Sequence, residues 1–286
     1  MPDHTNPPRR VAVLGRGLVP ADTPILRADD LGALRGDGIF ETMHVRDGQP
    51  WLLDKHLTRM AASAVRLNLD LPEFADLAEL AAQALDGWPA PVEGALRLVC
   101  TRGAESGGPV TVFATVAPIA PATIRARREG VSVATASLGF TADVRPKAPW
   151  LLGGAKTLSY AVNMASQRWA AEQGVDDVLW MSSDGYALEG PTSTLVWLDG
   201  GTLWTVPAQV TGILAGTTAR WLLDHSEDFG WSHGAKMIKP ADLYGTEGVW
   251  FTSSVRGLAE IRSIDGVELP LAADTEKIRS VLGFAA

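Results

Sequence analysis

The chain has 286 residues, of which 46% are hydrophobic, and its 25 Lys and Arg against 33 Asp and Glu give a net charge of -8. This acidic balance disfavours the clustered cations that nucleic acid requires, so no nucleic-acid partner is expected. The single cysteine, Cys100, cannot form an intramolecular disulfide, and no apolar run approaches the ~20 residues of a membrane span. With no apolar leader at the N-terminus, we expect a cytoplasmic protein without membrane contact.

The first part of the chain alternates strand and helix patterns after a proline-rich leader, residues 1–10, which we expect to be poorly ordered. The sequence Arg46-Asp47-Gly48 is a glycine-containing turn suited to a β-hairpin. Apolar residues at helical spacing then place His56 and Arg59 about one turn apart on one helix. The expected elements are a strand at 11–15, a hairpin of strands at 37–45 and 47–53, helices at 53–69 and 73–85, and paired strands at 95–103 and 110–118.

The second part of the chain is richer in strands, and Gly174 is placed as the C-terminal stop of its longest helix. The expected elements are strands at 131–137 and 177–182, a strand-rich stretch at 193–206, strands at 248–254 and 259–269, and helices at 157–174 and 217–225. We therefore predict a mixed α/β (α+β) fold of two lobes. These are a smaller N-terminal α/β lobe over 1–118, an interlobe linker over 119–130 and a larger strand-rich C-terminal lobe over 131–286.

Two charged residues lie in stretches that hold no opposite charge. From Ala148 through Gln167 the only charged side chain is Lys156, and no cation lies within fifteen residues of Glu189. An isolated lysine is either a surface residue whose head group reaches water or a buried amine kept for chemistry. An isolated carboxylate either faces solvent at a turn or pairs with a cationic nitrogen of a ligand.

Three other features suit a phosphate group. Gly216-Thr217-Thr218 opens an apolar helix, where backbone amides, hydroxyls and the positive end of the helix dipole converge, although an ordinary threonine cap explains it equally. Thr252-Ser253-Ser254 ends a strand, which is a common position for ligand contacts. Arg59 can bind a phosphate with two donors, although a solvated arginine is the ordinary alternative.

Other kinds of site are disfavoured. Gly15-x-Gly17 follows a strand as in a dinucleotide-binding turn, but Pro20 and Pro24 stand where the helix should begin. The five histidines occur singly without ligand spacing, so no metal is expected. No Gly-x-Ser-x-Gly sequence is present for a serine hydrolase.

Taken in chain order, these residues resemble those of the fold-type IV pyridoxal-phosphate enzymes, which include branched-chain aminotransferases, D-amino-acid aminotransferases and aminodeoxychorismate lyases. The resemblance runs from about Asp29 to the end of the chain and includes the "HLTR" that ends in Arg59. Its other motifs are "GDGIFET" at 36–42, "AKTLSY" around Lys156, "LEG" with Glu189, "GILAGTTAR" with Thr217 and Thr218, and "FTSS" with Ser254.

The resemblance implies that Lys156 forms the internal aldimine with pyridoxal 5'-phosphate and later moves the proton, while Glu189 holds the pyridinium nitrogen. It further implies two α/β lobes with the cofactor between them and a homodimer that completes the sites. Thr194 stands where the family usually has asparagine. The remaining cofactor contacts implied are Arg59, Thr217, Thr218 and Ser254 to the phosphate and Tyr160 to the ring hydroxyl.

Within the family, the sequence favours aminodeoxychorismate lyase, which converts 4-amino-4-deoxychorismate to 4-aminobenzoate and pyruvate in folate biosynthesis. "TRGAESGGPV" lacks the Arg-x-His clamp of D-amino-acid aminotransferases, and the motifs of branched-chain aminotransferases are also missing. The segments "LRLVCTRG" and "KTLSY" look more like the lyase forms. The alternatives are an aminotransferase of branched-chain or D-amino acids and a cofactor-free homologue, which the presence of Lys156 and Glu189 disfavours.

The family's lyase mechanism implies that Lys156, once displaced by the amino group of a small-molecule substrate, removes the ring proton at the amino-bearing carbon. From position alone, Arg102 is a candidate for binding a substrate carboxylate, although a surface role is equally compatible with its place in the sequence. Glu41 or Thr42 is a candidate for orienting the lysine.

Overall fold

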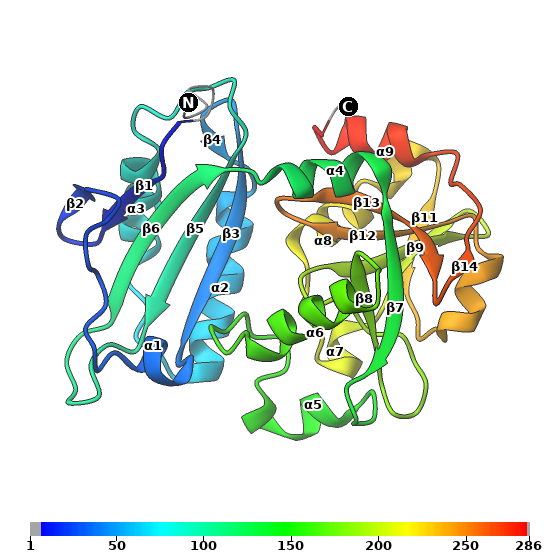
Figure 1. The fold of residues 1–286 in the computed structure, drawn as a ribbon, viewed down its shortest axis with the longest axis horizontal. Coiled ribbons are helices and arrows are strands. Elements are labelled where there is room, and N and C mark those ends of the chain that lie inside the picture. The colour runs from blue at the N-terminus through cyan, green and yellow to red at the C-terminus, as the bar shows by residue number, and fades with distance from the viewer. Residues whose placement is uncertain (1–6, 285–286) are drawn as a thin grey trace. The chain divides into compact units, whose positions relative to one another are not determined.

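A computed structural model describes residues 7–284, which fold into two compact units (Figure 1). Among the described residues, the first unit consists of 7–120 with Ala155–Tyr160, and the second of Pro121–Gly154 with 161–284. The first six residues of the proline-rich leader, which we expected to be poorly ordered, lie outside the described residues. The predicted mixed α/β class with two sheets is confirmed.

The first unit is built on a six-stranded antiparallel sheet in the order β2-β1-β6-β5-β3-β4. Helices α2 and α3 pack against it, and Met43, Met60, Leu80 and Leu98 are fully buried or nearly so in their shared core. The elements are β1 (Arg10–Val13), β2 (Gly17–Val19), α1 (Leu31–Arg35), β3 (Gly38–Arg46), β4 (Gln49–Pro50), α2 (Leu53–Leu67), α3 (Phe74–Leu85), β5 (Gly94–Thr101) and β6 (Thr111–Pro118).

The predicted hairpin is confirmed, since β3 and β4 pair through Val45 with Pro50 and Arg46 with Gln49. Asp47 and Gly48 form its turn with φ of 50° and 71°, the positive values that a two-residue type I′ turn requires. The second strand is shorter than predicted because α2 begins at Leu53.

Residues Ala155–Tyr160 extend this first sheet along the edge of β3. The Phe40 amide donates to the Lys156 carbonyl at 3.1 Å, the Leu158 amide donates to the Gly38 carbonyl at 2.8 Å, and Ile39 bridges Thr157. The sequence predicted a helix from residue 157 within the C-terminal lobe. The helix begins instead at Ala161, because the residues before it are hydrogen-bonded to β3.

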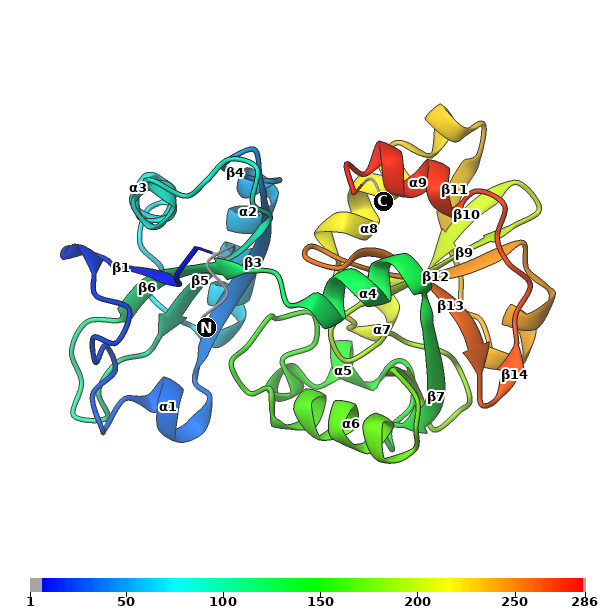
Figure 2. The same ribbon diagram turned by 45° about the horizontal axis from the view of Figure 1, so that its top comes forward.

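The second unit contains an eight-stranded sheet in which β11-β10-β9-β12-β13-β7-β8 are neighbours and β14 pairs with β13 (Figure 2). The pairs β10/β11, β13/β7 and β7/β8 are parallel and the others antiparallel. The strands are β7 (Val131–Ser137), β8 (Asp177–Met181), β9 (Thr194–Asp199), β10 (Thr202–Thr205), β11 (Ser232–Ala235), β12 (Gly248–Ser253), β13 (Gly257–Ile264) and β14 (Val267–Glu268).

Short helices complete this unit. The α-helices are α4 (Pro121–Glu129), α5 (Val144–Lys147), α6 (Ala161–Glu172), α7 (Ala208–Thr211), α8 (Thr217–Asp224) and α9 (Thr275–Val281). Three 3₁₀-helices, η1 (Pro149–Leu151), η2 (Ser226–Phe229) and η3 (Pro240–Gly245), lie between them. Within residues 7–284, no helix is both long enough and apolar enough to cross a membrane.

The stretch 119–130, expected to be a linker, consists mostly of helix α4. The boundary between the units falls at Ala120 and Pro121, and α4 belongs to the second unit. Pro121 is the first residue of the helix, where a fixed φ and a missing N–H are tolerated. The proline that suggested a linker therefore marks a helix start.

Candidate active site

Lys156 lies in the first unit beside two aromatic rings. Its side-chain nitrogen Nζ is 4.4 Å from the centroid of the Phe40 ring and 5.5 Å from that of Tyr160, and the two rings meet edge to face. The Lys156 backbone amide donates to Ser63 Oγ on α2 at 3.0 Å. The residue is half-buried, so its amine is held at a defined place against an apolar surface.

A buried cluster of charged groups lies where β3 meets α2. Both oxygens of Glu41 accept from Arg59, Oε1 from Nε at 2.7 Å and Oε2 from Nη2 at 2.7 Å. His56 Nδ1 lies 2.6 Å from Glu41 Oε2, and the His56 and Glu41 side chains are fully buried. This two-donor pairing fixes the plane of the Arg59 guanidinium.

The charge states of this cluster follow from its surroundings. Burial alone raises the pKa of the Glu41 carboxyl, but Arg59 and His56 outweigh burial and hold that pKa at about 2. Burial lowers the pKa of His56, with Arg59 and Lys156 adding to this effect and Glu41 opposing it. His56 is therefore neutral at neutral pH, with its Nδ1 proton donated to Glu41.

Arg102, the predicted carboxylate binder, makes contacts within the first unit. Its Nε and Nη2 donate to the two oxygens of Asp37 at 2.7 and 3.1 Å. Its Nη2 and Nη1 also donate to the carbonyls of Leu67 and Asn68 at the C-terminal end of α2, at 2.7 and 3.0 Å. These bonds cap a helix, and substrate binding by Arg102 stays a prediction.

Arg97, which no sequence motif singled out, lies against the same aromatic ring as Lys156. It stands opposite Thr42 in the β3/β5 register, and its guanidinium carbon lies 5.6 Å from the centroid of the Phe40 ring. Its Nε is 3.4 Å from Thr42 Oγ1, and it makes no ion pair within the described part of the chain. The sequence does mark Arg97, because it is the one charged residue in the apolar strand "ALRLVC", where charged residues are uncommon.

Thr42 and Glu41 thus lie on opposite faces of β3, since side chains alternate along a strand. Thr42 contacts Arg97, and Glu41 contacts Arg59 and His56. The idea that either residue orients the lysine stays a prediction.

Glu189 is positioned in the second unit, in the segment between β8 and β9. Its Oε1 pairs with Arg145 Nη1 at 3.3 Å, and its Oε2 accepts from the Leu214 amide at 3.2 Å. The carboxylate is mostly buried. The acid that is isolated in sequence therefore has a cationic neighbour in the fold, from 44 residues away.

The N-terminus of α8 carries the predicted hydroxyl groups. Gly216 has no side chain to cap the helix, and a Cβ there would meet Thr194 Oγ1 at 2.2 Å, so only glycine fits. Thr217 Oγ1 lies 3.4 Å from Ser254 Oγ. Thr218 Oγ1 is buried and has no hydrogen-bond partner among the described residues. A helix start with uncapped amides and an unsatisfied hydroxyl is suited to bind an anion.

The structure thus brings the predicted residues together in two sets. Lys156, Tyr160, Glu41, Thr42 and Arg59 belong to the first unit, and Glu189, Thr217, Thr218 and Ser254 to the second. Within residues 7–284, no group of three or more His, Cys, Asp or Glu side chains could hold a metal ion.

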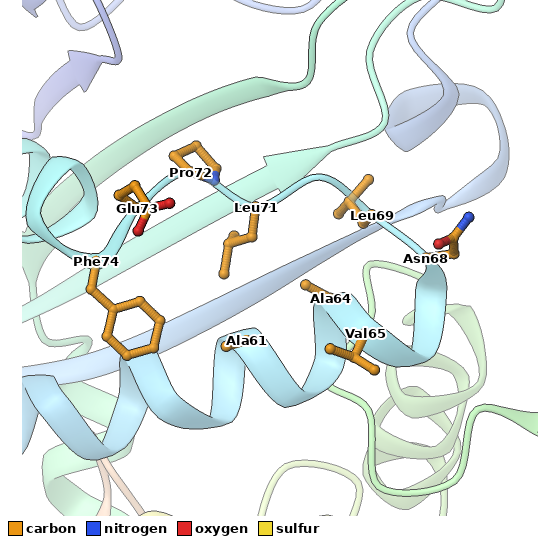
Figure 3. Close-up of a pocket in the computed structure, with 9 residues that line it drawn as sticks. All are labelled: Ala61, Ala64, Val65, Asn68, Leu69, Leu71, Pro72, Glu73 and Phe74. Carbon is orange, nitrogen blue, oxygen red and sulfur yellow. The ribbon is translucent and has the colours of Figure 1, made fainter.

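A separate groove of about 390 Å³ lies beside the C-terminal half of α2 (Figure 3). No predicted site residue lines it. Its lining consists of Ala61, Ala64, Val65, Asn68, Leu69, Leu71, Pro72, Glu73 and Phe74.

Comparison with known proteins places this geometry in context. The family model described as amino-transferase class IV matches residues 38–264. A bifunctional aminodeoxychorismate lyase / D-amino acid transaminase of Mycobacterium tuberculosis is 41% identical, over 91% of this chain and 93% of its own length. An aminodeoxychorismate lyase of Bacillus subtilis is 25% identical, over 90% and 87%. The PLP-bound form of a hypothetical aminotransferase from M. tuberculosis superposes with a TM-score of 0.92 and 39% identity, covering 96% of this chain and 98% of that one.

Because the pKa of Glu41 is lowered in the folded state, we expect the free energy of unfolding to depend on pH. The contribution of a carboxylate whose pKa is lowered on folding is complete above its unfolded-state pKa, 4.5, and is lost as the pH falls toward about 2. The substitution Glu41→Gln should lower the free energy of unfolding at pH 7 by about 3 kcal/mol, because Arg59 loses its carboxylate partner. Between pH 6 and pH 3, the free energy of unfolding measured with urea should fall by about 2 kcal/mol more for wild type than for the variant.

A matched control is Glu105→Gln, which removes the exposed ion pair with Arg35 and should change stability by less than about 0.5 kcal/mol. A Glu41→Gln protein that keeps the wild-type pH dependence would contradict the assignment of the cluster.

Proposed function

Because the chain belongs to the amino-transferase class IV family, which its match over residues 38–264 shows, we propose that it is a pyridoxal-phosphate-dependent aminodeoxychorismate lyase. The fold-type IV resemblance read from the sequence is thereby confirmed. The 41% identity to a bifunctional aminodeoxychorismate lyase / D-amino acid transaminase supports both reactions. The observation that carries the choice of the lyase is that "TRGAESGGPV" lacks the Arg-x-His clamp of D-amino-acid aminotransferases. The lyase-like "KTLSY" segment at Lys156 supports the same choice.

The residues present fit the cofactor. Thr218 Oγ1 is a buried hydroxyl that a phosphate oxygen would satisfy, and the uncapped start of α8 favours negative charge. We propose that Thr217, Thr218 and Ser254 hold the phosphate, with Arg59 as a further donor. Lys156 would attach the cofactor covalently, Tyr160 would hydrogen-bond its ring hydroxyl, and Glu189 would pair with its ring nitrogen. When bound, the cofactor supplies an electron-withdrawing ring that stabilises negative charge on the substrate.

Lys156 is the proposed acid–base group of the reaction. Once displaced by the substrate amine, its Nζ would take the proton from the ring carbon that bears that amine. The bond between the ring and the enolpyruvyl oxygen would then break, and protonation of the enolpyruvyl methylene carbon would give pyruvate as the ring becomes aromatic. The rings of Phe40 and Tyr160 flank Nζ at 4.4 and 5.5 Å and would limit the access of water to it.

Arg97 is proposed to bind a substrate carboxylate. Its guanidinium and the Lys156 amine both lie within 6 Å of the Phe40 ring centroid, at 5.6 and 4.4 Å, so an anion bound by Arg97 would be close to the reactive amine. Arg102, by contrast, already donates to a carboxylate and two carbonyls.

D-amino-acid transamination is the second candidate activity, favoured by the name of the same bifunctional relative. In that reaction an oxo acid must accept the amino group, whereas the lyase reaction needs no acceptor. The requirement for an oxo acid therefore separates the two proposals.

The protein is also proposed to form a homodimer. In the second unit, α6 and η1 each expose large apolar side chains, and burial of such side chains against a second copy of the chain is what we propose for this surface. The exposed fractions are 79% for Trp150, 43% for Leu151, 59% for Val162, 43% for Met164 and 38% for Trp169.

The lyase proposal predicts that purified protein loaded with pyridoxal phosphate releases 4-aminobenzoate and pyruvate from aminodeoxychorismate with no oxo acid added. Lys156→Ala should lose turnover by at least about 10³-fold and lack the visible absorbance of the lysine-bound cofactor, because no other group replaces the amine. Lys147→Ala, at an exposed lysine of α5, is the control and should match wild type. Turnover that depends on an added oxo acid would reject the lyase reaction in favour of the transaminase.

The carboxylate-binding proposal predicts that Arg97→Met raises the KM for aminodeoxychorismate about tenfold or more, the effect of losing one charge-assisted contact. The folded state should be little affected, because Arg97 is exposed and makes no ion pair in the described chain. Arg102→Met should instead lower the melting temperature, since it uncaps α2. If Arg102→Met raised the KM and Arg97→Met did not, Arg102 would be the carboxylate binder instead.

The dimer proposal predicts a solution mass of twice 30.4 kDa by light scattering. Trp150→Glu should shift that mass toward the monomer, because it places a charge on the apolar surface of α6 and η1. Leu271→Glu, at a 66% exposed leucine elsewhere in the unit, should leave the mass unchanged. A wild-type protein that is monomeric at micromolar concentration would exclude this interface.

A further inference from the structure

The turn between β12 and β13 carries one of the proposed phosphate contacts. Ser254 begins this turn, directly after β12, and its Oγ lies 3.4 Å from Thr217 Oγ1 at the start of α8. β13 begins at Gly257. The position of Ser254 relative to α8 therefore depends on the conformation of residues 254–257.

A buried arginine from α4 binds the backbone of this turn. Arg127 is only 3% exposed, its Nη2 donates to the Val255 carbonyl at 2.9 Å, and its Nε donates to the Arg256 carbonyl at 3.1 Å. A planar guanidinium that donates to two successive carbonyls fixes the orientation of both peptide planes. Figures 1 and 2 show α4 beside β13, within the same unit.

An aromatic ring near the C-terminus supports the same arrangement. The ring of Phe284, which is almost fully buried, lies under the guanidinium, with 4.5 Å from the Arg127 Cζ to the ring centroid. The same ring packs against Gly257, where a Cβ would meet it at 2.7 Å and where φ is 73°. Arg127 is thus held in place by a group that also contacts the end of the turn.

The side chain of the turn's own arginine is bound from a third direction. Arg256 Nη1 pairs with Asp177 Oδ2 at 2.8 Å, and the Asp177 side chain is fully buried at the start of β8. With its side chain and two of its carbonyls bound to other elements, the turn has little freedom to move.

We propose that Arg127 is a positioning residue for cofactor binding, which it supports by fixing the turn that presents Ser254 to the cofactor phosphate. This proposal rests on the proposed function, and it assigns to α4 a role in the site although α4 contributes no group to it. Losing Arg127 would leave two carbonyls without a strong donor, so the turn would relax and the Ser254 hydroxyl would shift. The effect should therefore be confined to the phosphate end of the cofactor.

The test compares two ligands that differ only in the phosphate, pyridoxal phosphate and pyridoxal, titrated into apo-protein with binding followed by absorbance. Arg127→Gln should weaken the binding of pyridoxal phosphate about tenfold while changing that of pyridoxal less than about twofold. Arg127→Lys, which keeps the charge and one donor direction, should lie between. Arg128→Gln, at an exposed arginine of the same helix, should match wild type.

Equal weakening of both ligands would indicate general damage to the fold and would overturn the proposal, as would unchanged binding of pyridoxal phosphate. If Arg127→Gln does not fold, Phe284→Leu is the substitute, since it removes the ring beneath the guanidinium. It should likewise weaken the binding of pyridoxal phosphate more than that of pyridoxal. Wild-type protein that binds no pyridoxal phosphate would instead reject the proposed function itself.

Discussion

The edge of β3 is the constraint on which the position of the candidate lysine, Lys156, depends. Two backbone hydrogen bonds and one bridge join residues 156–158 to Gly38–Phe40, so Lys156 is bonded to the edge of the first unit's sheet although the chain on both sides of Ala155–Tyr160 belongs to the second unit. A lysine on a loop would sample many positions, whereas one in a sheet register has its Cα fixed by neighbouring peptides. The same register presents Phe40 as the surface against which the amine lies.

The buried carboxylate of Glu41 has two defined partners. Glu41 is ionised inside the core because Arg59 and His56 offset the cost of burying it. A consequence is that the Arg59 guanidinium is oriented before any ligand binds. Preorganisation of this kind lowers the entropic cost of holding a phosphate, since the side chain does not need to be ordered at that moment.

The sequence predicted those features that depend on local pattern and failed where distant segments decide. Helix α2 and the β3/β4 turn follow from apolar spacing and from Asp47-Gly48, and the structure has both. Residues 157–160 were predicted to be helical because nothing local reveals their bonds to β3. Arg145 could not be assigned to Glu189, because the pair is 44 residues apart and joined only by the fold. The family motifs identified the candidate site residues, whereas the residues that contact them, such as Arg145 beside Glu189, are visible only in the folded structure.

A segment that connects two units can hold the backbone of a candidate site to which it contributes no side chain. The stretch 119–130 was predicted to be a linker because proline punctuates it, yet the one buried charged residue of its helix α4, Arg127, binds the turn that carries Ser254. A hydroxyl contributes to phosphate binding only if its backbone is held, since a shift of less than 1 Å weakens a hydrogen bond steeply. The two carbonyls bound by Arg127 are restrained by a group that no site motif includes, which is why motif matching alone overlooks it.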